Sequence, residues 1–307
     1  MRHALIAPAA WAAGALLGAA LAGCIADPPT ITPAPPTPDL RARVTPDAGT
    51  ATFRMEPSNT EIGLGFERFA FRLFNATGGE ITDAAVTTIF YTINEAAQET
   101  VRKASGEALY FGGDLPTGGR WVVYTEFDAS GPWSLDVTAV LPTGETGLAS
   151  ANVNVAGRTD TPYPGRPVPD GDTPSLADGV ALSDLTTDPD PDERLYAMSV
   201  ADAVATKLPT VVLFASPAHC ADQGCAATLR ALREVAAQYQ GRMNFIHIES
   251  RDPSDPAQLS AAAKAWGLRV DPWTFFFDAR GFVAGRIEGP VGADELKLMA
   301  DRTLKGR

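Results

Sequence analysis

The chain has 307 residues, a formal net charge of -12 and an isoelectric point near 4.7. Phosphate recognition needs clustered lysines and arginines, and the sequence has no such cluster, so its charge argues against a nucleic-acid partner. The length suggests about two domains. The 45% of hydrophobic residues can supply packed cores, while 25 prolines and 28 glycines indicate extended linkers between them.

The N-terminus has the pattern of a secretory signal peptide, expected over residues 1–23. Arg2 and His3 precede an apolar run of small residues over 4–22, and this run leads into Leu21-Ala22-Gly23-Cys24. The tetrapeptide resembles the lipobox of bacterial lipoproteins. That resemblance implies that Cys24 carries lipid and anchors the mature chain to a membrane on its extracytoplasmic side, in the cell envelope. An ordinary signal peptide, with Cys24 incidental, is the alternative.

Residues 24–49 are rich in proline, threonine and alanine and show no apolar period. We expect an extended tether that holds the rest of the chain away from the membrane. From residue 50 to residue 156, short alternating runs separated by turn residues take over. In the clearest run, every second residue from Trp133 to Ala139 is apolar, which is typical of a strand with one buried face.

About seven such runs predict an immunoglobulin-like or fibronectin-like β-sandwich over residues 50–156. The segment contains no histidine or cysteine, and its carboxylates are scattered. It therefore offers no catalytic constellation and is expected to be a spacer or binding module. The expected strands are 50–55, 69–74, 85–93, 107–111, 121–127, 133–141 and 148–155.

Residues 157–192 are again rich in proline and aspartate and are expected to form a second linker, partly docked through residues 180–185. From residue 193 the pattern alternates between strands and helices. The run 210–215 reads as a strand buried on both faces of a mostly parallel sheet. The expected elements are a helix 199–207, a strand 210–215, a helix 225–240, a strand 243–249, a helix 255–267, a hairpin of 273–278 and 282–287, and a helix 293–304.

Cys220 and Cys225 lie between the strand 210–215 and the helix that follows it. With Cys24 taken by the anchor, they are the two remaining cysteines, and in an oxidising compartment they can pair with each other. A helix N-terminus carries roughly half a positive charge, which stabilises a thiolate relative to its thiol. The order of strand, cysteine loop and helix therefore predicts a cysteine that is nucleophilic near neutral pH.

This order of elements, with Val270-Asp271-Pro272-Trp273-Thr274 before the third strand, resembles the thioredoxin fold over roughly residues 195–307. The whole arrangement resembles bacterial lipoproteins that join an immunoglobulin-like domain to a thioredoxin-like one. The expected fold class is therefore two-domain: an all-β immunoglobulin-like sandwich, followed by an α/β thioredoxin-like fold over residues 193–307.

The resemblance implies a thiol-disulfide oxidoreductase that acts on thiols and disulfides of exported proteins without a cofactor. Cys220 would attack a substrate disulfide, and Cys225 would be the resolving thiol that releases the reduced product. Pro272 matches the cis proline that lies opposite the cysteines in thioredoxins, although it could also be an ordinary proline that opens a strand. His219, if protonated, would favour the Cys220 thiolate, or it could be a plain exposed loop residue.

The sequence departs from thioredoxins in three ways. Four residues separate the cysteines instead of two, so the loop must fold back and Cys220 must lie off the helix. His219 replaces the tryptophan that precedes the first cysteine. The run 210–215 has no acid where thioredoxins keep a buried aspartate as proton shuttle.

Two other functions remain open at this point. The first is a non-catalytic binding module in which Cys220 and Cys225 form a structural disulfide. The second is a copper carrier, because soft thiolates favour Cu(I). The one distant histidine, His247, sits in an expected buried strand, where a packed core residue is more common than a ligand.

Overall fold

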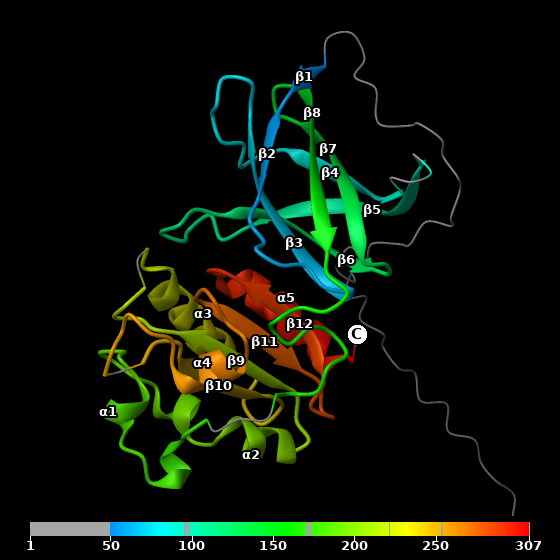
Figure 1. Ribbon diagram of the computed structural model, residues 1–307. Helices are drawn as coiled ribbons and strands as arrows, with labels where there is room; N and C mark the ends of the chain where they lie inside the picture. Colours follow the sequence, from blue (N-terminus) through cyan, green and yellow to red (C-terminus); the bar gives the residue numbers. More distant parts are fainter. Residues whose placement is uncertain are drawn as a thin grey trace, which may run out of the picture.

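The computed structural model describes residues 50–94, 97, 99–169, 173–220, 222–252 and 254–306. The expected signal peptide, Cys24 and the expected tether lie outside these residues. Among the described residues, no helix has both the length and the apolar character needed to span a membrane. The described chain forms two β-sheets, one above the other in Figure 1, with the helices gathered around the lower sheet.

The first sheet has eight strands, hydrogen-bonded in the order β1-β8-β7-β4-β5-β6-β3-β2. β1 pairs with β8 in parallel, and the other neighbours are antiparallel. The sheet curls so that β2, at one end of this order, contacts β8 near the other end, and it nearly closes on itself (Figure 1). Its strands are β1 (Ala51–Thr52), β2 (Arg54–Pro57), β3 (Gly65–Phe74), β4 (Ala85–Asn94), β5 (Glu99–Phe111), β6 (Arg120–Phe127), β7 (Gly131–Val140) and β8 (Thr146–Val155).

The inside of the curled sheet is filled with aromatic side chains. β7 buries every second residue from Trp133 to Ala139, as the alternating pattern predicted. The Phe90 ring meets Phe69 and Phe127 edge-on, with ring centroids 5.9 and 5.7 Å apart, and Phe127 meets Trp133 in the same way at 5.0 Å. Edge-to-face contacts of this kind add to the hydrophobic gain of burying the rings.

The second sheet has four strands in the order β10-β9-β11-β12. β10 is parallel to the central β9, whereas β11 is antiparallel to β9 and β12 is antiparallel to β11. The expected mostly parallel sheet is thus corrected to a mixed one, although β9 is buried along its whole length as predicted. The strands are β9 (Thr210–Ala215), β10 (Asn244–Glu249), β11 (Trp273–Phe277) and β12 (Val283–Glu288).

Helices cover both faces of this sheet. Val211 and Leu213 of β9 point into a core shared with α3 and α5, while Val212 and Phe214 point into a second core shared with α2 and α4. This division explains why β9 has no polar face. The helices are η1 (Leu176–Asp178), α1 (Leu182–Leu185), η2 (Glu193–Tyr196), α2 (Val200–Ala205), α3 (Gly224–Gln238), α4 (Ala261–Ala265) and α5 (Ala293–Leu304).

A buried ion pair joins the two sheets. Arg68 of β3 donates through Nε and one terminal nitrogen to the two carboxylate oxygens of Glu295 on α5, at 2.6 and 2.9 Å. Both side chains are almost inaccessible, with exposed fractions of 4% and 1%. The Tyr124 hydroxyl of β6 also donates to Glu295, at 2.7 Å. Burial and the Glu295 charge raise the pKa of Tyr124 well above its ordinary value.

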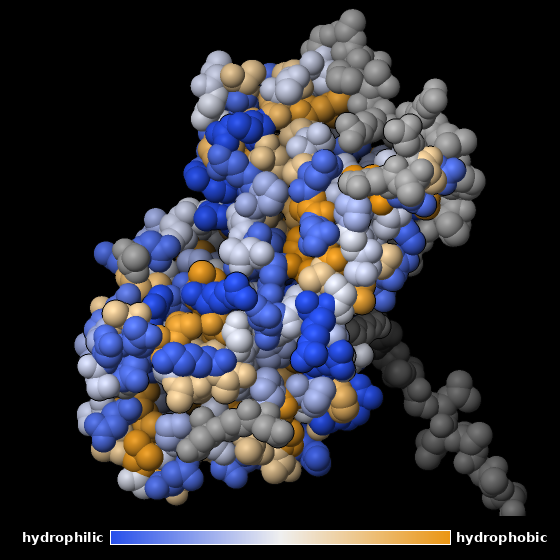
Figure 2. Space-filling view, viewed as in Figure 1, coloured by the Kyte–Doolittle hydropathy of each residue, from blue (hydrophilic) through white to orange (hydrophobic). Residues whose placement is uncertain are grey.

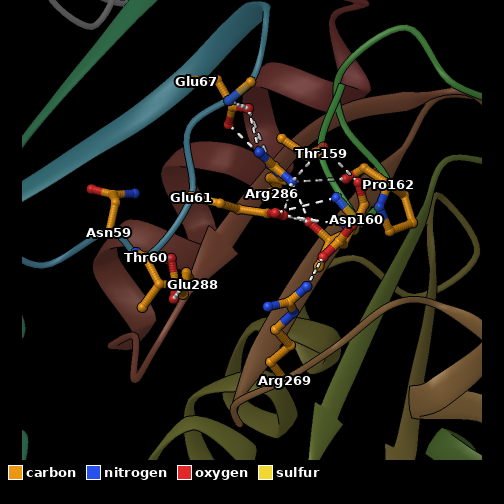
Figure 3. A network of polar contacts seen from close by, with 12 residues as sticks. Asn59, Thr60, Glu61, Glu67, Thr159, Asp160, Pro162, Arg269, Arg286 and Glu288 are labelled. Atoms are coloured by element: carbon orange, nitrogen blue, oxygen red, sulfur yellow. Dashed lines mark hydrogen bonds and ion pairs between the residues drawn. The ribbon is translucent and has the colours of Figure 1, made fainter. Parts of the chain in front are cut away.

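A second buried cluster lies close to the first and centres on Arg286 of β12 (Figure 3). Its guanidinium contacts Glu67 of β3 at 2.6 Å and Glu61 at 3.0 Å, and it also donates to the Thr159 hydroxyl at 3.4 Å. Burial raises the pKa of Glu67 despite the opposing effect of Arg286. This cluster fixes β12, the β2–β3 connection and the segment after β8 to one another.

These contacts overturn the expected fold class. The described chain is mostly β, and the first unit is one nearly closed eight-stranded sheet instead of an immunoglobulin-like sandwich of two sheets. The second unit is not a distinct α/β thioredoxin-like domain, because its strand β12 and helix α5 share buried charges with β3. Removing either unit would leave these charges without partners, so the two form one structure.

Several elements have limits that differ from those expected, and α4 and β5 differ the most. The helix predicted over 255–267 is the short α4, because the Ser260 hydroxyl accepts the Ala263 backbone N–H at 3.2 Å and caps the helix there. The Asp255 carbonyl instead closes a turn with the Gln258 N–H at 2.8 Å. β5 has 13 residues, far more than the expected 107–111. Its N-terminal half lacks the strict alternation that marks a strand in sequence.

Candidate functional site

The two cysteines form a disulfide at the end of the central strand. β9 ends at Ala215, and the Ser216 carbonyl accepts the backbone N–H groups of His219 and Cys220 at 2.9 and 3.0 Å. This turn places Cys220 in front of α3, with its Cα atom 5.8 Å from that of Cys225. The expected pairing of the two cysteines is thus confirmed.

The described residues between the cysteines, 222–224, turn the chain back as the spacing required. Gln223 adopts the left-handed conformation with φ of 59°, and the Asp222 carboxylate accepts the Gly224 N–H at 3.0 Å. A side chain on Gly224 would collide with the Pro290 ring. α3 therefore begins at Gly224, and Cys220 lies off the helix, as predicted.

The two sulfurs have different surroundings. Cys225 is fully buried, whereas Cys220 is only partly buried at the rim of the same core. The backbone N–H of Cys225, in the first turn of α3, donates to Cys220 Sγ at 3.2 Å. This bond and the helix dipole favour a thiolate on Cys220, while the Asp222 carboxylate, 3.7 Å from the same sulfur, opposes it. Cys220 is thus the less buried of the two cysteines.

The bond between Asp271 and Pro272 is cis, as expected, and the Asp271 carboxylate lies beside the disulfide. One Asp271 oxygen lies 4.0 Å from Cys225 Sγ. The same carboxylate accepts the Ser250 hydroxyl at 2.7 Å and an Arg251 guanidinium nitrogen at 2.8 Å, and only 6% of its side chain is exposed. The sequence analysis missed Asp271. Its position directly before Pro272, which was already expected to face the cysteines, was the available signal.

Buried serine hydroxyls connect Asp271 to a further carboxylate beneath the cysteine loop. The Ser250 hydroxyl lies 3.1 Å from that of Ser216, and Ser216 in turn donates to the Glu249 carboxylate. Glu249 also accepts the Thr187 backbone N–H at 2.6 Å. A chain of polar groups therefore runs from Glu249 to Asp271 and ends beside Cys225.

His219 stands next to Cys220 with an exposed side chain. Its backbone N–H holds the turn at Ser216, but no hydrogen bond within the described residues joins its imidazole to either sulfur. Its expected effect on the Cys220 thiolate stays a prediction.

His247 is a core residue of β10. Its Nε2 lies 3.1 Å from the Ala215 carbonyl, which can only accept, so Nε2 carries the proton and Nδ1 accepts the Tyr196 hydroxyl at 2.7 Å. Burial is the main cause that lowers the pKa of His247 to about 4. Both ring nitrogens are occupied, and His247 does not belong to the group of side chains around the sulfurs. The copper-carrier hypothesis thus loses its histidine ligand.

The sulfurs of Cys220 and Cys225 and an Asp271 oxygen lie within 4.8 Å of one another, which is close enough to hold a metal ion. The sulfurs are joined in the disulfide, however, and the Asp271 oxygens already accept from Arg251 and Ser250. A cation would compete with the Arg251 guanidinium. These residues fit a metal poorly, and we assign none.

The buried His247 should make the fold sensitive to mild acid. Between its ordinary pKa of 6.5 and its folded value of about 4, the unfolded chain binds a proton that the folded chain does not. We expect the free energy of unfolding to fall by about 3 kcal/mol as the pH drops through this window. Urea unfolding of the wild type and of His247→Gln at several pH values measures it, with His219→Gln as the exposed control. Equal pH dependence in wild type and His247→Gln would contradict the assignment.

Comparisons with known proteins add no assignment. No protein-family model matches the chain, and no curated protein matches it. Among solved structures, a cohesin module from a family 33 glycoside hydrolase of Clostridium perfringens is 14% identical and covers 34% of this chain and 98% of its own, with a TM-score of 0.18. A TM-score this low supports no argument about fold or function.

Proposed function

We propose that this protein is a thiol-disulfide oxidoreductase of the cell envelope, tethered to a membrane through lipid on Cys24. Its redox couple is the pair Cys220 and Cys225, and its substrates are the thiols and disulfides of exported proteins. The lipobox at the N-terminus is the support for the tether and for the extracytoplasmic location.

The unequal surroundings of the two sulfurs carry this proposal. Disulfide exchange needs one sulfur that a substrate can approach and a second that attacks only from within. Cys220 is partly exposed and receives the Cys225 N–H at the start of α3, whereas Cys225 is fully buried. A disulfide that served only to fasten a loop would not require this asymmetry.

In the reductive direction, the Cys220 thiolate attacks one sulfur of a substrate disulfide, and the other substrate sulfur leaves as a thiolate. Cys225 then attacks Cys220 Sγ, the bond from Cys220 to the substrate breaks, and the substrate leaves with its second sulfur reduced. Two electrons pass from the pair to the substrate. An external dithiol, or two monothiol molecules that form a disulfide with each other, must reduce the pair again before the next turnover.

The reduction potential of the pair tests the proposal. We expect a value in the range of disulfide oxidoreductases, roughly -270 to -120 mV, because the N–H at Cys220 stabilises the reduced thiolate. The protein is equilibrated in glutathione buffers of known ratio, quenched with acid and alkylated, and the oxidised fraction is read by mass.

A structural disulfide remains the second candidate, and the burial of Cys225 is the observation that favours it. It requires a potential below about -300 mV and no catalysis of disulfide reduction in a model substrate such as insulin. Finding both would contradict the oxidoreductase.

A further inference from the structure

The proposed exchange reaction does not yet say where the proton of the buried Cys225 thiol goes. Before Cys225 can attack the mixed disulfide, its thiol must lose a proton, and its fully buried side chain has no direct contact with water to take one. A thiol in apolar surroundings resists ionisation because burial disfavours the charged form. The reaction therefore needs a proton acceptor inside the protein.

The described residues offer one acceptor at the right place. Among the described aspartates, glutamates and histidines, only Asp271 has a side-chain oxygen or nitrogen grouped with both sulfurs within 4.8 Å. Its nearer oxygen is 4.0 Å from Cys225 Sγ, and this is the same oxygen that accepts the Ser250 hydroxyl. β9 carries no acid that could take this role.

We propose that Asp271 is the catalytic base that accepts the proton of Cys225 during release of the substrate. This inference rests on the proposed oxidoreductase function. As Cys225 Sγ attacks Cys220 Sγ, the Cys225 proton passes to the Asp271 carboxylate, the new S–S bond forms and the substrate sulfur leaves as a thiolate. Charge is conserved, because one carboxylate is neutralised and one thiolate is released.

The neighbouring groups prepare Asp271 for this step. Arg251 pairs with both of its oxygens, at 2.8 and 3.2 Å, and so fixes the position of the side chain. Through Ser250 and Ser216 the carboxylate is linked to the buried Glu249. Asp222 lies 3.7 Å from the other sulfur, Cys220 Sγ.

A reagent disulfide separates the two steps. When the reduced protein meets excess 5,5′-dithiobis(2-nitrobenzoate), attack by Cys220 releases one yellow thiolate, and attack by Cys225 on the resulting mixed disulfide releases a second. We expect Asp271→Asn to keep the first phase and to slow the second by about a hundredfold near pH 7. The second phase should recover as the pH rises, because hydroxide replaces the lost base. Asp83→Asn, which removes an exposed charge from the β3–β4 connection of the first sheet, should leave both phases unchanged.

The outcomes distinguish the two proposals. A second phase that Asp271→Asn leaves unchanged, or a loss that higher pH does not restore, would overturn the role of Asp271 while the exchange reaction itself stands. If the wild type releases no thiolate in either phase, the oxidoreductase function fails and the base falls with it.

Asp271→Asn also removes the partner of Arg251, so its fold is compared with that of the wild type by circular dichroism. If this variant does not fold, Ser250→Ala serves in its place, because it removes the hydroxyl that orients the reacting oxygen and leaves the ion pair intact. We then expect the same selective slowing of the second phase, smaller in size, and an unchanged second phase would overturn the proposal.

Discussion

Replacing Glu295 with glutamine should destabilise the protein by about 3–5 kcal/mol, because it leaves the buried Arg68 guanidinium without its counter-charge. Arg68 and Glu295 have exposed fractions of only 4% and 1%, so water cannot solvate the remaining charge. The Tyr124 hydroxyl loses a charged acceptor at the same time. Urea unfolding, followed by intrinsic fluorescence, measures the change in the free energy of unfolding.

The neighbouring acid on α5 gives a matched control. Asp294 precedes Glu295 in the first turn of the same helix but is exposed, so Asp294→Asn should cost at most about 1 kcal/mol through the helix dipole. The combined variant Arg68→Met, Tyr124→Phe and Glu295→Leu should recover most of the lost stability, because an apolar replacement leaves no unpaired charge. Equal losses for Glu295→Gln and Asp294→Asn would contradict the role given to this pair.

The same ion pair explains why the fold class could not be predicted from the sequence. Arg68 and Glu295 are 227 positions apart, and Arg286 and Glu67 are 219 apart. In a strand, a charged residue normally indicates a solvent-facing position, so β3 gave no sign that its charges are buried against another sheet. The pattern of one segment cannot show a partner that lies two hundred residues away.

Local features were predictable where a single physical rule governs them. The unbroken apolar run of β9 indicated a strand buried on both faces, and its end before Ser216 was correctly predicted. Residues five positions apart on one helix point in different directions, so the spacing of Cys220 and Cys225 required Cys220 to lie off the helix. The structure has Cys220 in the turn before α3. Figure 2 shows apolar side chains in separate patches over both sheets on the face in view.

Of the candidate site, the paired sulfurs and the cis bond before Pro272 were predictable. Asp271 was placed beside Pro272 but given no role, and Ser250 and Arg251 carried no signal, because their importance comes from a shared contact with Asp271. The missing acid of β9 was correctly noted, but it does not exclude an acid from another part of the chain. The Asp271 carboxylate reaches Cys225 from the segment before β11, and its place directly before Pro272 was the one sign of this in the sequence.

The two cysteine variants should differ completely in their reaction with a disulfide substrate. Cys220→Ala is expected to lose all exchange, because the remaining Cys225 is fully buried and cannot be approached. Cys225→Ala keeps the accessible sulfur and should attack the substrate once, then remain joined to it because no second thiol can resolve the bond. Incubation of each protein with oxidised glutathione, followed by intact mass measurement, detects one bound glutathione on Cys225→Ala and none on Cys220→Ala.

This difference between the two variants distinguishes a redox-active disulfide from a structural one. If the disulfide only stabilises the fold, either alanine removes the same cross-link, and both variants lose a similar amount of stability, of about 2–5 kcal/mol at most. Neither would then retain glutathione in the folded state. An adduct on Cys225→Ala alone requires that Cys220 is accessible and reactive. We expect this because Cys220 lies before α3 and its sulfur accepts the Cys225 N–H. Adducts on both variants, or on neither, would contradict the order of attack.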